Sequence, residues 1–227
     1  MESNTEVIPT VKLKCVVLGD GGVGKTSTIK RYVEDRFESR YAETIGVTFS
    51  LKKLKGINID GKTYDIIIVL WDLAGQQTYA ELRKRYTTGS DMATFIFDVT
   101  RPTSFLNLIN WYDKLKTTSK DIPLAFIANK IDRDEDRLVP NDCGEMIHRW
   151  LGASYYECSA KSNINVDQVF VELAKNAAKR QLIRKERERK ELIIDTLPED
   201  VIESRSMNTL LEMSLDELKS LSEQYNN

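Results

Sequence analysis

The sequence predicts an α/β protein in which helices cover both faces of a mostly parallel sheet. Along its 227 residues, short apolar runs alternate with amphipathic segments of helical period, which is typical of parallel sheets. A glycine-rich turn joins the first apolar run to the first helical segment. The length fits one domain of ordinary size and a tail. We therefore expect an N-terminal tail over residues 1–10, a globular domain over 11–178 and a charged, amphipathic helical extension over 179–227.

The expected elements follow one another from the N-terminus. Residues 13–18 form an apolar run that predicts the first strand, and residues 26–34 predict the first helix. Residues 47–54 and 64–70 predict a hairpin around Asp60-Gly61, whose first strand is the one antiparallel member of the sheet. Strand–helix units then continue to the end of the domain. The later strands that we expect include residues 123–128 and 154–158.

The glycine-rich turn predicts a site for the phosphates of a nucleotide. It reads Gly19-Asp20-Gly21-Gly22-Val23-Gly24-Lys25-Thr26 and fits the pattern G-x-x-x-x-G-K-[ST]. Glycines let backbone N–H groups approach phosphate oxygens, and the following helix, with Ser27 in its first turn, points its positive end at them. Lys25 would neutralise β- and γ-phosphate oxygens, and the Thr26 hydroxyl would bind Mg²⁺. The strand before and the helix after argue against a chance glycine-rich turn.

Two further motifs, each at the end of an expected strand, favour guanine as the base. The first is Asn129-Lys130-Ile131-Asp132, in which the Asp132 carboxylate can accept from the ring N–H and the exocyclic amine of guanine. Asn129 would brace neighbouring loops, and the stem of Lys130 would cover one face of the base. The second motif is Ser159-Ala160-Lys161, in which the Ala160 N–H would donate to the guanine carbonyl.

A last motif, Trp71-Asp72-Leu73-Ala74-Gly75-Gln76, follows the apolar strand at residues 64–70. Asp72 would hold Mg²⁺ through water, and the Gly75 N–H would face the γ-phosphate. Gln76 would orient the attacking water.

With these motifs the chain resembles the Ras superfamily of small GTPases over about residues 11–178, and within it the Rab family most. Rab-like stretches are Ile45-Gly46-Val47-Thr48-Phe49, Trp71, Phe97-Asp98-Val99-Thr100 and Ser104-Phe105. The resemblance implies the P-loop small-GTPase fold with a six-stranded, mostly parallel sheet. It implies that Thr44 joins Mg²⁺ and the γ-phosphate, that Phe37 stacks on guanine and that Tyr41 covers the phosphates. The implied catalytic residues are Gln76, Lys25 and Thr44.

Some positions depart from the Rab pattern in the second switch segment. Leu73 stands where threonine is typical, Gln77 where glutamate is typical, and Thr78-Tyr79 where arginine-phenylalanine is favoured. None of them removes a catalytic group. They alter a surface that exchange factors read, so the exchange factors of relatives need not act on this chain.

Composition narrows the function classes. Lys plus Arg (33) nearly balance Asp plus Glu (35), and a net charge of −2 argues against a broad nucleic-acid surface. Three cysteines offer neither a disulfide framework nor metal-ligand spacing, and the single histidine, His148, lies far in sequence from every motif. The start lacks a signal peptide, and the longest apolar run, residues 66–71, cannot span a bilayer. We therefore expect a cytoplasmic protein without a transmembrane segment.

The tail predicts helices and no lipid anchor. The last cysteine is Cys158, so we expect no prenylated C-terminus and a protein that is either soluble or recruited to membranes by a partner. The final helix of the domain continues through residues 184–191, where opposite charges at i, i+4 favour a solvated helix over a lipid-binding patch. Two apolar stripes follow, with a capping box at Ser214-Leu215-Asp216-Glu217. The stripes dock onto the chain's own domain, or they bind a partner or a second copy. They consist of Ile194, Leu197, Val201 and of Leu211, Leu215, Leu218.

The sequence as a whole predicts a switch that binds GTP or GDP with Mg²⁺ and slowly hydrolyses GTP. Exchange factors, GTPase-activating proteins and effectors would bind its two switch segments. Two alternatives belong to other classes: a small P-loop phosphotransferase or ATPase, against which Asp132 argues, and a GTP-binding scaffold with little or no turnover.

Overall fold

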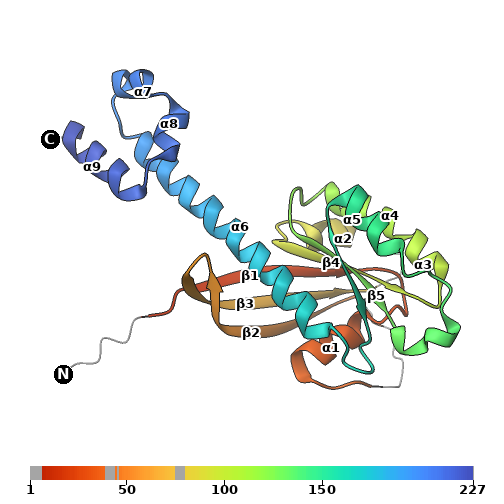
Figure 1. Ribbon diagram of the computed structural model, residues 1–227. Helices are drawn as coiled ribbons and strands as arrows, with labels where there is room; N and C mark the ends of the chain where they lie inside the picture. Colours follow the sequence, from red (N-terminus) through yellow and green to blue (C-terminus); the bar gives the residue numbers. More distant parts are fainter. Residues whose placement is uncertain (1–6, 39–43, 45, 75–79, 227) are drawn as a thin grey trace, which may run out of the picture. The chain divides into compact units, whose positions relative to one another are not determined.

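The computed structural model of the chain describes residues 7–38, 44, 46–74 and 80–226, with the backbone alone at 80–83 and 226 (Figure 1). By its contacts the chain divides into two compact units, Met1–Ala178 and Lys179–Asn227. Helix α6 (Val166–Ile194) supplies residues to both units, which are described separately below.

The first unit is built on a six-stranded sheet with the order β2-β3-β1-β4-β5-β6. Only β2 runs antiparallel to its neighbour among the described strand pairs, as the sequence predicts. The predicted fold class, a mostly parallel sheet covered by helices with a helical C-terminal extension, is confirmed. The strands are β1 (Thr10–Leu18), β2 (Val47–Ile59), β3 (Lys62–Leu73), β4 (Met92–Asp98), β5 (Leu124–Asn129) and β6 (Ser154–Cys158).

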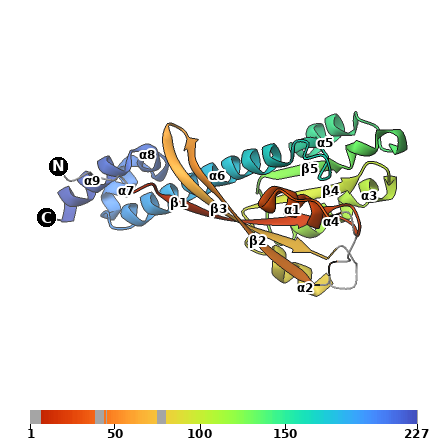
Figure 2. The same ribbon diagram turned by 90° about the horizontal axis from the view of Figure 1, so that it is seen from below.

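The β2–β3 hairpin is longer than expected but turns at the predicted residues (Figure 2). Asp60 and Gly61 both have positive φ, 48° and 83°, which is what a tight two-residue hairpin requires. A register shift between Leu54 and Ile57 explains why the expected first strand stopped early. At the shift Gly56 has a φ of 65° and donates its N–H to the Asp65 carboxylate at 3.0 Å. The strand therefore continues past a bulge that interrupts its alternation of side chains.

Helices cover both faces of the sheet. Figure 1 shows α1 (Lys25–Glu34) on one side and α2 (Ala80–Thr87), α4 (Leu108–Lys116) and α5 (Cys143–Leu151) on the other. Tyr32 of α1 stacks on Phe170 of α6 with ring centroids 4.5 Å apart, so these two helices pack together. On the opposite face Phe95 and Phe97 of β4 belong to a buried cluster with Trp111 of α4. The structure also describes helix α3 (Pro102–Leu106) and the 3₁₀ helix η2 (Ile131–Asp136) in this unit.

The parallel strands bring the sequence motifs to one edge of the sheet. β1, β3, β4, β5 and β6 are parallel, so their carboxyl ends share that edge. The glycine-rich loop follows β1, Asp72 lies near the end of β3, Asn129 ends β5, and Ser159 follows β6. In open α/β sheets this is the edge where ligands bind.

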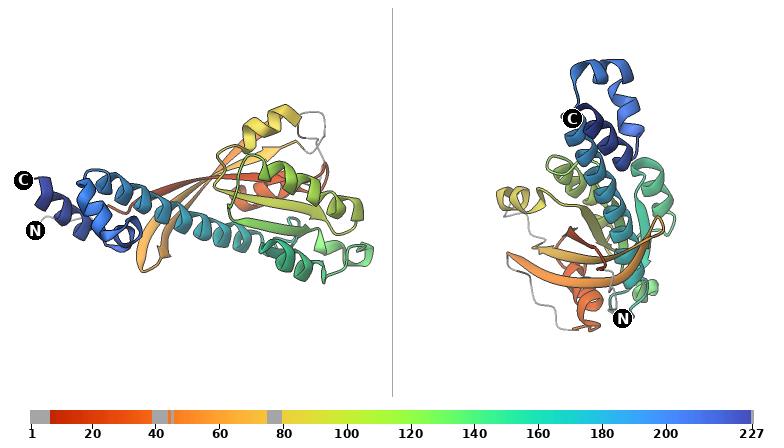
Figure 3. Two further views of the ribbon diagram at one scale, coloured as in Figure 1. Left: turned by 90° about the horizontal axis from the view of Figure 1, so that it is seen from above. Right: turned by 90° about the vertical axis from the view of Figure 1, so that its left-hand side faces the viewer.

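The second unit is a helical module with a core of its own. The blue helices of Figure 3 include α7 (Glu199–Arg205), α8 (Met207–Glu212) and α9 (Leu215–Asn226), which group with the last turns of α6. The first predicted stripe and Leu218 of the second bury their side chains in one cluster. Leu211 packs against this cluster half-buried, whereas Leu215 is half-buried outside it. That cluster consists of Ile194, Leu197, Val201, Leu210, Leu218 and Leu221.

Local predictions for the module are confirmed. The Ser214 N–H donates to the Glu217 carboxylate at 2.7 Å and the Glu217 N–H donates to the Ser214 hydroxyl at 3.3 Å, which is a capping box. The three i, i+4 ion pairs of α6 form, with Arg187 and Glu191 the closest at 2.8 Å. In the described part of the chain no helix combines the length and apolar character that a membrane span needs.

Candidate nucleotide site

Two glycines of the phosphate loop (residues 19–26) are required where the backbone closely approaches its neighbours. Gly19 has a φ of 139°, and a Cβ there would lie 2.1 Å from the Ile96 carbonyl oxygen. Gly24 has a φ of 100°, and its Cβ would lie 2.2 Å from the Asn129 amide nitrogen. At Gly21, by contrast, a Cβ would meet no atom within 4 Å. The loop is thus tightly packed where it joins the sheet and open at its tip, where a ligand would approach.

Lys25 lies inside this loop. Its ammonium donates to the carbonyl oxygens of Gly19 and Asp20, both at 2.8 Å, and the residue is 6% exposed. The loop is therefore curled around a cation, an arrangement suited to phosphate oxygens.

Three oxygen-bearing side chains predicted to hold Mg²⁺ come together beside Lys25. The Thr26 hydroxyl donates to the Asp72 carboxylate at 2.5 Å and lies 2.8 Å from the Thr44 hydroxyl. Since Thr26 has one proton to give, Thr44 donates to Thr26. The second Asp72 oxygen is buried and has no hydrogen-bond partner among the described residues.

The environment of Asp72 fits a hard cation. Burial raises the pKa of this carboxyl group, although the hydrogen bond from Thr26 and the charge of Lys25 act in the opposite direction. An ionised carboxylate with one unpaired oxygen, next to two hydroxyls, offers the oxygen ligands that Mg²⁺ prefers. The predicted set Thr26, Thr44 and Asp72 can therefore hold this ion.

Asn129 and Lys130 connect the loop after β5 to the phosphate loop. The Asn129 amide donates to the Val23 carbonyl at 2.8 Å and accepts from the Ala160 N–H at 3.2 Å. The Lys130 ammonium donates to the Gly22 carbonyl at 2.9 Å. The Ala160 N–H, expected to face a guanine carbonyl, thus already has a long hydrogen bond to Asn129 in this structure.

Asp132, the residue expected to read guanine, is held by the loop after β6. One carboxylate oxygen accepts from the Ser159 hydroxyl at 2.6 Å, and the other lies 3.8 Å from the Lys161 ammonium. Ser159 is fully buried and in turn accepts from the Ser162 N–H at 2.9 Å. These contacts fix the carboxylate between two of the predicted motifs.

Sequence reasoning assigned no role at the site to Asp98 or Arg31, which organise the loops after β5 and β6. Asp98, at the end of β4, pairs with Lys130 at 2.6 Å, and its other oxygen accepts from the N–H and hydroxyl of Thr100. Burial would raise the pKa of Asp98, but the hydrogen bonds from Lys130 and Thr100 outweigh it and lower this pKa. Arg31 donates to the carbonyl oxygens of Ala160 (2.9 Å) and Lys161 (3.2 Å). A carboxylate at a strand end was a usable signal for Asp98, whereas nothing in the sequence pointed to Arg31.

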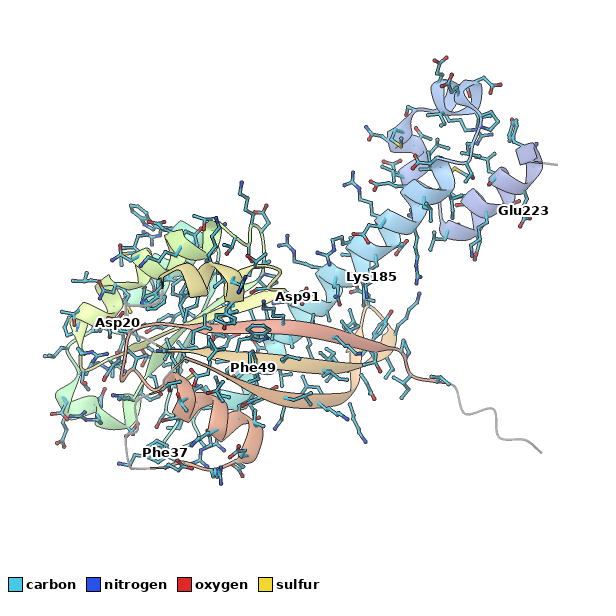
Figure 4. All side chains as sticks on the ribbon, turned by 180° about the vertical axis from the view of Figure 1, so that it is seen from behind. Asp20, Phe37, Phe49, Asp91, Lys185 and Glu223 are labelled. Atoms are coloured by element: carbon cyan, nitrogen blue, oxygen red, sulfur yellow. The ribbon has the colours of Figure 1, made fainter. Side chains whose placement is uncertain are left out.

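The remaining predicted residues are less directly placed at the site. The Asp20 carboxylate accepts from Asn107 and Trp111, and Phe37 is 36% exposed in the segment after α1 (Figure 4). Ser27 is half-buried in the first turn of α1, and Leu73 is buried. Tyr41, Gly75, Gln76, Gln77, Thr78 and Tyr79 lie outside the described residues.

A glycine-rich loop between the central strand β1 and helix α1, at the carboxyl edge of a mostly parallel sheet, defines the P-loop class of α/β proteins. The sequence model of the Ras family matches residues 14–179, and the chain belongs to this family. It is therefore a small GTPase of the Ras superfamily.

Its curated relatives include Rab-named proteins. The chain is 34% identical over 170 residues to Ras-related protein RABE1e of Arabidopsis thaliana, covering 74% of this chain and 76% of the relative. It is 34% identical over 164 residues to Ras-related protein Rab-8A of Gallus gallus, covering 72% and 77%. It is 35% identical over 164 residues to Ras-related protein Rab-8 of Diplobatis ommata, covering 72% and 76%. The resemblance to Rab proteins is thus confirmed.

Proposed function

We propose that this chain is a switch that binds GTP or GDP with Mg²⁺ and slowly hydrolyses GTP to GDP and phosphate. The observation that supports this most directly is the pair of hydrogen bonds from Asn129 and Lys130 to the phosphate loop. They join a loop suited to phosphates and a carboxylate suited to guanine, at Asp132, into one site.

Each of the predicted site residues would have its own role in binding the nucleotide or in hydrolysis. Lys25 and the backbone N–H groups of the loop bind the β- and γ-phosphates, and Asp132 selects guanine. Thr26, Thr44 and Asp72 hold Mg²⁺, which when bound would neutralise developing charge on the phosphates. Gln76 orients the attacking water. Loss of the γ-phosphate would release Thr44 and the switch segments, which changes the surface that partners bind.

The test is to incubate the purified chain with Mg²⁺ and either GTP or ATP, and to follow bound nucleotide and released phosphate. We expect selective binding of GTP and hydrolysis at about 10⁻⁴ to 10⁻² per second, because no arginine was recognised as a catalytic group in the matched sequence. Equal binding of GTP and ATP would contradict the proposal. Selective binding without phosphate release would favour the alternative, a GTP-binding scaffold.

The hydrolytic role of Gln76 has its own test. Gln76→Leu should lower the rate of phosphate release at least about tenfold and leave GTP affinity unchanged, because leucine cannot hydrogen-bond the attacking water. Single-turnover hydrolysis and equilibrium GTP binding measure the two quantities. Hydrolysis at the rate of the unaltered chain would reject this role.

We further propose that the switch acts in vesicle or membrane trafficking or related signalling. The resemblance to Rab proteins supports this, and exchange factors, GTPase-activating proteins and effectors would be its partners at the two switch segments. The proposed location is the cytoplasm, with recruitment to membranes by a partner.

A further inference from the structure

The carbonyl groups of the phosphate loop have an unusual set of partners. Five successive carbonyl oxygens, from Gly19 to Val23, each accept a hydrogen bond from a side chain. Lys25 donates to the carbonyls of the first two residues. Lys130 donates to that of Gly22, and Asn129 to that of Val23. The middle one, Gly21, accepts from the Arg101 guanidinium at 2.7 Å.

This arrangement determines which way the loop presents its donors. In a trans peptide the N–H and C=O groups point in opposite directions, and no described peptide bond is cis. Holding the five carbonyls on side chains therefore turns the N–H groups of residues 20–24 to the other side, the side open to a ligand. A hydrogen bond to a carbonyl also polarises its peptide unit, which strengthens the N–H of that unit as a donor.

The segment of chain that supplies Arg101 also binds Asp20, the residue before Gly21 in the phosphate loop. Both carboxylate oxygens of Asp20 are engaged, one by the Asn107 amide at 2.8 Å and the other by the Trp111 indole N–H at 2.9 Å. Trp111 is 6% exposed within the core cluster, so one of these donors is fixed by packing. Hydrogen bonds to a charged acceptor are stronger than neutral ones.

The placement of Arg101 carries a cost in stability. Its Nε atom is buried and has no hydrogen-bond partner among the described residues. A buried N–H without a partner costs free energy. The side chain is nevertheless held against the loop, where its charge favours an anionic ligand.

We propose that Arg101, Asn107 and Trp111 are positioning residues that hold the phosphate loop in its phosphate-binding form and thereby slow nucleotide release. We call these three residues the loop clamp. The inference rests on the proposed function, since it concerns how tightly the same site keeps GDP or GTP. It adds residues from the segment after β4, which no sequence motif indicated, to those that set the rate of nucleotide release.

The test is the rate at which a fluorescent GDP analogue leaves the full chain in Mg²⁺ after addition of excess GDP. We expect Asp20→Ala to speed release about tenfold, since it removes both acceptors and since tenfold corresponds to one strong hydrogen bond. Arg101→Gln should also speed release, and Arg101→Lys less so, because lysine can still donate to the Gly21 carbonyl. Asp113→Asn, on the exposed side of α4, is the matched control and should release at the unaltered rate.

A double-mutant comparison separates positioning from general weakening of the fold. Asn107→Ala added to Asp20→Ala should cause no further acceleration, because its partner is already gone. The preference for guanine over xanthine should not change in any clamp variant. Variants that melt at lower temperature yet release GDP at the unaltered rate would overturn the proposal, as would fully additive effects. If the unaltered chain binds no guanine nucleotide, the proposed function itself fails, which is a different result.

Discussion

Asp72 is a single residue whose placement at the candidate metal site lowers the stability of the fold. Its carboxylate is 3% exposed, and one of its oxygens has no partner among the described residues. Burial raises the pKa of this group above its ordinary value of 3.8. The contribution of Asp72 to folding is therefore most favourable below pH 3.8 and is lost as the pH rises through the folded-state pKa.

Asp72→Asn should accordingly stabilise the chain when Mg²⁺ is absent. Asparagine can still accept the Thr26 hydrogen bond but carries no buried charge, so we expect a gain of about 1 kcal/mol at pH 7. Urea unfolding in EDTA, repeated from pH 7 down to pH 4, measures this gain, which should shrink as the pH falls. With Mg²⁺ and GTP the order should reverse, because the variant lacks a ligand charge. A variant less stable in EDTA would contradict this account of Asp72.

Asp132 gives a second prediction about a single residue. Asp132→Asn should shift the preference of the chain from guanine toward xanthine, because the amide offers a donor where the carboxylate accepted two hydrogen bonds. Ser159 can donate to the amide oxygen as it does to the carboxylate, so the loop should keep its shape. Competition of GDP and XDP for the site measures the shift, and retained selectivity for guanine would refute the assignment of Asp132.

At this scale the sequence predicted the residues whose chemistry is written in a local motif. Lys25, Thr26 and Asp132 are such residues. The structure brings Thr26 to Asp72 and Asp132 to Ser159, and the roles of all three residues stay predictions. Arg101 and Trp111 could not be found in this way, because their contacts join segments 80 and 91 positions apart. The use of the Ala160 N–H by Asn129 likewise depends on the packing of two loops.

At the scale of elements, the strands were predictable where their side chains alternate or are uniformly apolar. β6 has the expected bounds, and β2 was underestimated because the bulge at Gly56 breaks the alternation. Helix α6 was expected to continue past the domain, and its i, i+4 ion pairs show why a charged surface need not end a helix.

The capping box of α9 allows a prediction about one element. Ser214→Ala removes the hydroxyl that accepts from the Glu217 N–H, so it should destabilise the start of α9 by about 1 kcal/mol. Hydrogen exchange of the α9 amides measures the effect. Ser220→Ala, on the exposed side of the same helix, is the control and should not lower protection, because alanine favours a helix. Equal exchange in both variants would show that the cap contributes nothing.

At the scale of the whole molecule, each of the two units has a buried cluster of its own among the described residues. The pattern of the tail showed two stripes that needed burial but could not show that they bury each other, because their pairing depends on the turns between α7, α8 and α9. In the structure the whole first stripe and Leu218 of the second lie in one cluster within residues 179–227, and Leu211 packs against it, whereas Leu215 is not part of it. Docking of this module on a partner or on the first unit stays a prediction.

Leu218→Ala tests this division into two cores. Leu218 is fully buried in the second cluster, so its truncation should cost that module about 2 to 5 kcal/mol. We expect faster hydrogen exchange in α7, α8 and α9 with unchanged affinity for GDP, because every residue of this cluster belongs to the second unit, whereas the phosphate loop belongs to the first. Leu192→Ala, which truncates a side chain 70% exposed, is the control and should change neither quantity. Weaker GDP binding in Leu218→Ala alone would contradict the division.

The side chains that hydrogen-bond the carbonyls from Gly19 to Val23 also bear on the rate at which the loop would release a nucleotide. A loop already fixed in shape loses little conformational freedom when a ligand arrives, so the ordering cost is met during folding and not at binding. Under the proposed function, such a loop would release its nucleotide slowly, and spontaneous exchange would rarely return the chain to its other state. The time spent in each state would then depend on other proteins, which would open the loop or complete the hydrolytic site. A preformed phosphate loop would thus leave the duration of each state under the control of regulators.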